Sequence, residues 1–347
     1  MNNRSNIMVL QGQFEKLNNV HYEIDIREQT LGEGGTGIVR HGVMVDENSG
    51  IRRDVAIKFL YNDLSENAIQ RSRREAEIHI VHENLIEMLG FVQIGEMDLY
   101  GKGNVHYHVV SELLNGVMLL DMLNEKVQPY VYSQYPKIKS YHDELMNNRY
   151  SFALRIIRCI LSGIMMLHDK GYIHRDIDPS NIMITDEGKV KLIDLGICKR
   201  LETINTTSLT SIGQFVGKEA YAAPELASGD INHQNVTTDI YAVGIMLYQI
   251  ITGSLPFTGT MQDVLEKQKN EKIILKPIRD KKVRELIKKA TEKKQSDRFQ
   301  SAAEFRVAID SIKNIKIEST DSDNIWLIAA ILSFLGLGLG ALLAFMI

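Results

Sequence analysis

The sequence predicts an α+β fold of two lobes, one rich in strands and one helical, followed by a single apolar helix. Three observations support this fold class. Residues 22–115 read mostly as β-like sequence around one helical segment, and apolar residues recur at helical spacing from 151 onward. Residues 325–347 are apolar almost throughout. The length of 347 residues is sufficient for two packed lobes of ordinary domain size.

The predicted organisation divides the chain into five parts. In order they are a polar N-terminal extension (1–21), the strand-rich lobe (22–115), the helical lobe (116–312), a polar linker (313–324) and the apolar helix (325–347). Within the helical lobe, tyrosines gather in an insertion at about 124–150. We interpret it as a surface insertion, and a docking surface for a partner is the alternative.

Composition excludes some classes of function. The chain has 44% hydrophobic and 24% charged residues, as globular proteins do. Its net charge of −4 gives no general nucleic-acid signal, so we expect no nucleic-acid partner. The two cysteines, Cys159 and Cys198, lack the spacing of a metal site and suggest no disulfide framework.

The strand-rich lobe begins with a glycine-rich stretch, "LGEGGTGIVRHG". Its glycines have the GxGxxG spacing, and glycines let backbone amides approach a phosphate without obstruction by Cβ. A dinucleotide site would need a strand, a turn and a helix. Here β-like sequence flanks the glycines on both sides, which favours a β-hairpin that covers a bound nucleotide. The predicted nucleotide-binding residues of this hairpin are Leu31, Gly32, Glu33, Gly34, Gly35, Thr36, Gly37 and Val39.

A charged pair is predicted downstream of the hairpin. Lys58 stands in the apolar strand "DVAIKF", and Glu75 stands on a predicted helix in "RREAEIHIVHENL". A lone Lys in such a strand is more often solvated. Paired with Glu75, its ammonium would be aimed at the α- and β-phosphates of a nucleotide.

Three polar residues in the helical lobe complete the pattern. Asp176 stands in "HRDIDPSNIMI", Asn181 follows five residues later, and Asp194 opens "DLG" thirteen residues after that. With these spacings the chain resembles the protein-kinase family over roughly residues 22 to 312. The resemblance implies the bilobal protein-kinase fold, ATP and Mg²⁺ as cofactors, Asp176 as the residue that orients the substrate hydroxyl, and Asn181 and Asp194 as metal ligands.

Later motifs extend the resemblance and narrow the substrate class. "YAAPEL" contains Glu225, "SDRFQ" contains Arg298, and we expect these two to pair; Asp239 is expected to brace the backbone of the catalytic loop. Related small-molecule phosphotransferases generally lack these later elements, so protein substrates are implied. Pro179 in "DPSN" favours Ser/Thr over Tyr specificity. The implied activity is that of a protein serine/threonine kinase.

Two further expectations follow from the resemblance. In "HVVSELLNG", Ser111 aligns with the gatekeeper position, where a small side chain leaves a pocket behind adenine. Glu112 and Leu113 would offer backbone groups to the base, and Ala56 is assigned to the same nucleotide site. Arg175, next to Asp176, is typical of kinases whose activation loop is ordered by phosphate, which predicts autophosphorylation between residues 203 and 211.

Two positions depart from the family pattern. Ser/Thr kinases carry Lys two residues after the catalytic Asp, and this chain has Asp178; the Thr expected before "YAAPEL" is Lys218. Our hypothesis is that Lys218, paired by Asp178, supplies the missing positive charge to the site. The alternatives are two solvated loop residues with slower catalysis, or a nucleotide-binding scaffold without turnover.

The apolar segment 325–347 predicts a single-pass membrane anchor. As a helix it would span about 34 Å, against roughly 30 Å of hydrocarbon, and it holds one polar side chain, Ser333. Lys313 and Lys316 lie just before it, which predicts that the lobes are cytoplasmic, since positive residues tend to stay on that side. Gly336 and Gly340 form a GxxxG pair, which predicts either a homodimer or mere packing of small residues.

Overall fold

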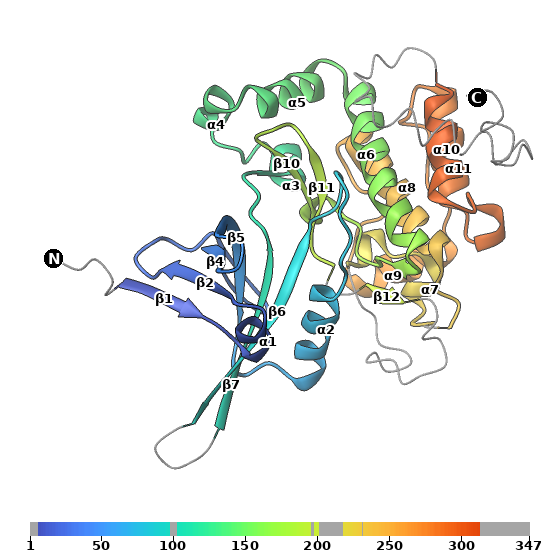
Figure 1. Ribbon diagram of the computed structural model, residues 1–347. Helices are drawn as coiled ribbons and strands as arrows, with labels where there is room; N and C mark the ends of the chain where they lie inside the picture. Colours follow the sequence, from blue (N-terminus) through green and yellow to red (C-terminus); the bar gives the residue numbers. More distant parts are fainter. Residues whose placement is uncertain (1–5, 98–102, 196–197, 201–217, 231, 313–347) are drawn as a thin grey trace, which may run out of the picture. The chain divides into compact units, whose positions relative to one another are not determined.

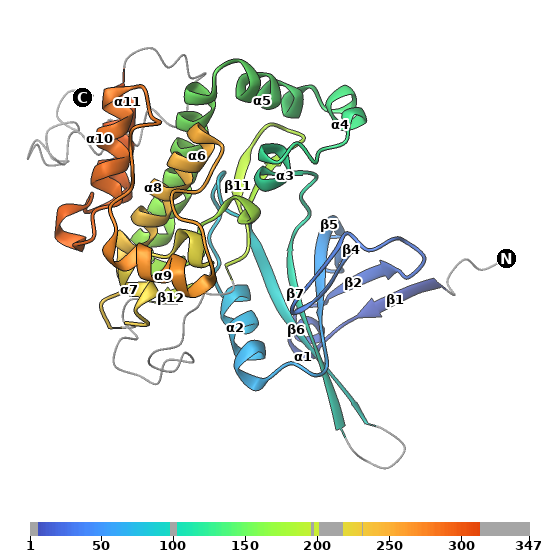
Figure 2. The ribbon, with the colours of Figure 1, turned by 180° about the vertical axis from the view of Figure 1, so that it is seen from behind.

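The first lobe is built on a seven-stranded antiparallel sheet, shown with the rest of the chain in Figure 1 and from behind in Figure 2. The structure is a computed structural model that describes residues 6–97, 103–195, 198–200, 218–230 and 232–312. Strand order is β1-β2-β4-β5-β7-β6, and β3 pairs with β4. The strands and helices of this lobe are β1 (Ile7–Leu10), α1 (Gln13–Leu17), β2 (Val20–Asp25), β3 (Gly32–Gly34), β4 (Gly37–Asp46), β5 (Ile51–Leu60), α2 (Glu66–Ala76), β6 (Met88–Met97) and β7 (Gly103–Glu112).

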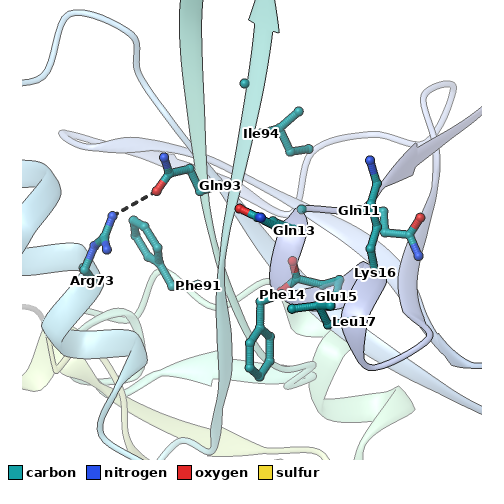
Figure 3. Close-up of a pocket in the computed structure, with 12 residues that line it drawn as sticks. Gln11, Gln13, Phe14, Glu15, Lys16, Leu17, Arg73, Phe91, Gln93 and Ile94 are labelled. Carbon is teal, nitrogen blue, oxygen red and sulfur yellow. Dashed lines mark hydrogen bonds between the residues drawn. The ribbon is translucent and has the colours of Figure 1, made fainter.

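The first strand and helix lie in the segment that the sequence suggested was an extension. Strand β1 pairs with β2 from Ile7 opposite Asp25 to Leu10 opposite Tyr22, and the last two of these side chains lie in the core of the lobe. Helix α1 lies beside β6, where the two elements and Arg73 line a cavity of about 720 Å³ (Figure 3). The segment is therefore part of the folded lobe.

The second lobe is mainly helical. Its helices are α3 (Leu119–Leu123), α4 (Pro129–Gln134), α5 (Pro136–Asn147), α6 (Arg149–Asp169), α7 (Pro224–Ala227), α8 (Val236–Thr252), α9 (Met261–Asn270), α10 (Lys281–Ala290) and α11 (Ala302–Asp310). Its strands are β8 (Gly116–Met118), β9 (Tyr172–Ile173), β10 (Ile182–Thr185), β11 (Val190–Leu192) and β12 (Lys199–Arg200). Strands β11, β10 and β8 form one small sheet, and β12 pairs with β9.

The central helix of this lobe is α8, which packs against α6 and α10. It begins with a capping box between Asn235 and Thr238 and ends at Gly253, whose φ of 76° favours glycine. Between these caps its side chains are apolar on nearly every face, and almost all of them are buried. A helix apolar all round belongs in a core, so α8 provides the frame to which the surrounding loops attach.

Among the described residues, one helix, α6, is long and apolar enough to cross a membrane. Phe152, Ile157 and Leu161 on this helix are fully buried, and α6 packs against α8 and α11. Its apolar surface is thus explained by the core of the lobe. The predicted anchor at 325–347 lies outside the described residues.

The insertion at 124–150 is folded against the lobe. Helix α5 packs against α6 and buries Ile138 and Leu145. The Tyr141 hydroxyl donates a hydrogen bond of 3.0 Å to the carbonyl oxygen of Gly188, and the Arg155 guanidinium stacks 3.9 Å from the centre of its ring. Because these contacts bury one face of α5, this part of the insertion is structural. Tyr130 of the neighbouring helix α4 is exposed.

A buried ion pair joins α7 to the segment before α11, as the sequence predicted. Arg298 is 1% exposed and donates two parallel hydrogen bonds to the Glu225 carboxylate, at 2.8 and 2.9 Å. Arg298 also donates to the carbonyl oxygens of Glu292, Lys293 and Thr237. The pair therefore closes the helical lobe around the start of α8.

Arg298→Ala should lower the free energy of unfolding by about 3–5 kcal/mol, because it leaves the Glu225 carboxylate buried without its partner. Urea denaturation measures this change. Arg279→Ala, an exposed arginine of the same lobe, is the control and should stay within about 0.5 kcal/mol of the parent chain. A loss below about 1 kcal/mol for Arg298→Ala would contradict the proposed role of the pair.

Candidate active site

The strand register gathers the predicted nucleotide-binding residues on one face of the sheet. Lys58 lies opposite Val39, and Ala56 lies opposite both His41 and Ser111. Along β5 the side chains alternate, so that Val55 and Ile57 are fully buried in the core and Ala56 and Lys58 are partly exposed on the other face. Val39, Ala56, Lys58 and Ser111 therefore share the face that looks away from the core.

The glycine-rich stretch forms the predicted hairpin, with Gly32 opposite Val39 and Gly34 opposite Gly37. A Cβ at Gly37 would lie 2.0 Å from the carbonyl oxygen of Phe59, so protein packing alone explains that glycine. At Gly32, Gly34 and Gly35 a Cβ would have no neighbour within 4 Å. Packing does not require those three, and their open surroundings fit the approach of a phosphate chain to the backbone.

The catalytic loop is held by a buried carboxylate, as predicted. Asp239 is 1% exposed at the start of α8 and accepts hydrogen bonds of 2.8 Å from the backbone N–H groups of His174 and Arg175. Its Oδ2 also lies 2.8 Å from Nε2 of His168. Burial alone would raise the pKa of Asp239, but these hydrogen bonds lower it overall. Arg175 has a φ of 71°, a strained value for a non-glycine residue that this brace supports.

Asp176 follows directly, and its carboxylate is prepared for a proton. Asn181 Nδ2 donates 2.9 Å to the carbonyl oxygen and 3.1 Å to Oδ2 of Asp176. The other oxygen, Oδ1, is buried and has no hydrogen-bond partner. Burial raises the pKa of Asp176, and the neighbouring carboxylate of Asp178 raises it further. An unsatisfied buried carboxylate oxygen of raised pKa is a suitable acceptor for a substrate hydroxyl.

Asp194 and Asn181 are the residues that could hold a magnesium ion. Asp194 is exposed and has a φ of 62°, which turns the backbone directly after β11. Asn181 is 8% exposed and uses its amide hydrogens on Asp176, leaving its oxygen as the ligand. Across the described ranges no cluster of three or more His, Cys, Asp or Glu side chains could hold a metal alone. One or two oxygen ligands completed by phosphates are typical of Mg²⁺, so the residues fit that ion.

The expected ion pair between Lys58 and Glu75 is not formed. Both residues are described, and no ion pair of 4.0 Å or less joins them. Glu75 is 7% exposed in the last turn of α2 and accepts a hydrogen bond from the backbone N–H of Leu195. Burial and the Asp194 carboxylate raise the pKa of Glu75 to about 7, which outweighs the opposite effect of Lys58. Helix α2 ends one residue later, so Glu75 contacts the segment after β11 instead of the ammonium.

Asp178 and Lys218 do lie together. Lys218 Nζ donates a hydrogen bond of 2.7 Å to Asp178 Oδ1 and also contacts the Ser180 hydroxyl. The Asp178 side chain is 2% exposed and that of Lys218 is 43% exposed, so the carboxylate is fixed while the ammonium reaches solvent. Asp178 further caps the short 3₁₀ turn Pro179–Asn181 through the N–H of Ser180, at 2.7 Å.

Sequence reasoning missed Lys191, which holds the hinge between the lobes. This buried lysine of β11 donates 2.5 Å to Glu112 Oε1 and 3.0 Å to the carbonyl oxygen of Leu85. The same Glu112 oxygen accepts the backbone N–H of Glu87, at 2.8 Å. A lysine inside the apolar run "VKLI" was the available signal, because a charge there needs a partner. Leu113, at the expected hinge position, is partly exposed directly after Glu112.

Comparison with known proteins agrees with this geometry. The family model that matches residues 26–308 is described as "Protein kinase domain". A probable serine/threonine-protein kinase of Clostridium perfringens is 28% identical over 85% of this chain and 40% of its own length. Probable serine/threonine-protein kinase PknB of Lactococcus lactis is 33% identical over 66% of this chain and 31% of its own. Serine/threonine-protein kinase PknL of Mycobacterium tuberculosis is 29% identical over 66% and 49%.

The chain thus spans less than half the length of these curated relatives. The family match nevertheless covers most of the chain and includes the elements that build the site, from the glycine hairpin to the start of α8. The fold and motifs predicted from the sequence are those of this family, and the chain belongs to the protein kinase family.

Proposed function

We propose that the chain is a serine/threonine protein kinase that transfers the γ-phosphate of ATP to hydroxyl groups of protein substrates. The observation that carries the proposal is the buried, unpartnered Oδ1 of Asp176, held beside Asn181 and next to a face of the sheet that carries Lys58. The serine/threonine-protein kinases to which the chain is similar support the substrate class.

Each residue has one task in this mechanism. Asp176 accepts the proton of the substrate hydroxyl or aligns it, and Asn181 fixes the Asp176 carboxylate. Lys58 contributes a positive charge on the nucleotide face, and the open glycines admit the phosphate chain. Asn181 and Asp194 would hold Mg²⁺, which would supply positive charge to neutralise the phosphates. Lys218, oriented by Asp178, adds a cation next to the catalytic loop.

Regulation through the activation loop is a further part of the proposal. Burial is the main reason that the pKa of Arg175 falls to about 10, and the like charges of Arg71 and Arg74 on α2 lower it further. Three arginines from two lobes thus lie close together, a suitable site for a phosphate group. We propose that phosphorylation between residues 203 and 211, which lie outside the described residues, supplies that phosphate.

We also propose that residues 325–347 anchor the chain in a membrane, with both lobes in the cytoplasm. The support is the apolar sequence and its length, since the segment lies outside the described residues. Gly336 and Gly340 are compatible with a homodimer and equally with simple helix packing.

Asp176→Asn and Lys58→Met should each reduce kcat/KM by about 10²- to 10⁴-fold, because positioning and charge stabilisation supply most of this catalysis. Transfer from labelled ATP to a protein substrate, followed by phosphoamino-acid analysis, measures rate and specificity together. Lys126→Met, an exposed lysine outside the predicted site, is the control. ATP binding without any transfer by the parent chain would favour the scaffold alternative.

The Asp178–Lys218 pair is tested by a double-mutant cycle. Asp178→Lys alone should place two ammonium groups together, and Lys218→Thr alone should leave an unpaired carboxylate next to the site. The double variant restores the residues usual in the family and should be more active than either single variant, with a coupling of about 1 kcal/mol or more. Strictly additive losses would mean that the two residues do not act together.

Asp178→Asn should move the acid limb of the kcat/KM–pH profile to lower pH. The Asp176 carboxylate is needed in its ionised form, so activity is lost as pH falls through its raised pKa. Removing the Asp178 charge lowers that pKa, so the acid limb moves even where the substitution also changes the maximum of kcat/KM. Glu75, with a pKa of about 7, is the rival group, and Glu75→Gln is the control. A limb that Asp178→Asn leaves in place and Glu75→Gln removes would belong to Glu75.

A further inference from the structure

A concentration of positive charge lies in the C-terminal part of the helical lobe. Residues 267–294 contain 12 Lys and Arg and 4 Asp and Glu, a net charge of +8. The whole chain has 40 Lys and Arg and 44 Asp and Glu. The residues outside 267–294 therefore have 28 basic and 40 acidic side chains, a net charge of −12. A basic segment in an otherwise acidic chain indicates an electrostatic task of its own.

Helix α10 directs much of this charge to one side. At 100° per residue, Lys281, Lys282, Glu285, Lys288 and Lys289 fall within an arc of about 120°. All five are exposed, while Val283, Leu286, Ile287 and Ala290 are buried on the opposite side. Four lysines and one glutamate therefore form a continuous basic stripe.

Stability of the helix does not explain the two lysines at its start. Lys281 and Lys282 occupy the first turn of α10, where the helix dipole disfavours cations, and the turn has no acidic residue. Lys289 pairs with Glu304 at 2.6 Å. Within the part of the chain that the structure describes, Lys281, Lys282 and Lys288 form no ion pair. Lys281 and Lys282 oppose the helix dipole and repel each other, so an external anion would stabilise them, whereas Lys288 lies in the last turn, where the dipole favours a cation.

The segment between α9 and α10 exposes an apolar side chain between two lysines. Ile274 is 74% exposed and lies between Lys272 and Lys276, which are both exposed. Ile278, fully buried, fixes the segment to the lobe, and the backbone N–H of Arg279 donates 2.8 Å to the Tyr150 hydroxyl. An aliphatic side chain is thus presented from a fixed base among cations.

This combination favours a lipid surface over a nucleic acid. Proteins that bind single strands without sequence preference use aromatic side chains for stacking, and residues 267–294 contain no aromatic residue. Cations around an exposed aliphatic residue are typical of segments that rest on anionic headgroups and place the apolar side chain at the acyl boundary.

We propose that the surface formed by Lys272, Ile274, Lys276, Lys281, Lys282 and Lys288 binds anionic lipid headgroups and orients the kinase lobes on a bilayer. The inference rests on the proposed membrane anchor. Residues 312–324 could extend at most about 45 Å, so the lobes would stay close to the bilayer. Both views place α10 and α11 at the end of the helical lobe away from the seven-stranded sheet (Figures 1 and 2), which leaves the nucleotide face open.

Amine footprinting of the full-length chain tests the proposal. The chain is reconstituted in phosphatidylcholine vesicles with and without phosphatidylglycerol, and lysine acetylation is read by mass spectrometry. Reactivity of Lys272, Lys276 and Lys281 should fall on the order of three-fold or more in the anionic vesicles, and high salt should restore it. Lys126, Lys137 and Lys170, exposed elsewhere, are internal controls and should not change. Equal reactivity in both vesicles, or a uniform fall at all lysines, overturns the proposal.

Variants separate charge from apolar contact. Lys281→Glu with Lys282→Glu and Lys288→Glu should abolish protection of Lys272 and Lys276, while the same changes at Lys126, Lys137 and Lys170 should leave it intact. Ile274→Asp should reduce the protection as well, and full protection in that variant overturns the lipid contact. Protection by single-stranded RNA in detergent, without protection by anionic vesicles, would assign the surface to nucleic acid instead.

The anchor and the kinase activity are checked separately. Flotation with neutral vesicles at high salt reports on residues 325–347 alone, because the electrostatic contact is then screened. If the chain fails to float, the footprint is repeated with added anionic vesicles, and protection there supports the surface without the anchor. Phosphoryl transfer in detergent remains a third, independent measurement.

Discussion

The active site depends on one buried carboxylate, Asp239, at the start of the central helix. It accepts two backbone hydrogen bonds from the catalytic loop and contacts His168, so three elements meet at a single side chain. The two backbone bonds support the positive φ of Arg175, and that strained residue directs Asp176 toward Asn181. Because α8 is buried on nearly every face, the close-packed core holds Asp239 in a fixed position.

Charge in the site is arranged differently from the family pattern. Three carboxylates, those of Asp176, Asp178 and Asp194, lie near one another, and the first has a raised pKa because of burial and its neighbours. The cation that accompanies them, Lys218, comes from the opposite loop and keeps 43% of its side chain exposed. A cation mounted in this way is less constrained than one within the catalytic loop. Its position depends on Asp178, which is itself fixed by Ser180 and Asn181.

Motifs with fixed spacing predicted most of the site. The glycine hairpin, the Asp239 brace and the Glu225–Arg298 pair follow from short stretches of sequence that pack in one way only. The Asp178–Lys218 contact was predictable for a similar reason, since two reversed charges in facing loops need each other. The sequence did not predict where α2 ends. The helix ends at Ala76, and Glu75 is buried and accepts a hydrogen bond from Leu195, with Lys58 acting on it only through its charge.

The remaining differences arise from tertiary packing of segments without a clear motif. Strand β1 has only four residues, and its pairing with β2 depends on Leu10 reaching the core of the lobe. Lys191 shows the same principle at the hinge. Its strand, β11, is three residues long, yet it carries the ammonium that fixes Glu112 and leads within two residues to Asp194. One short strand therefore sets the position both of Glu112 and of Asp194, the proposed metal ligand. A shift of β11 along its axis would displace both at once.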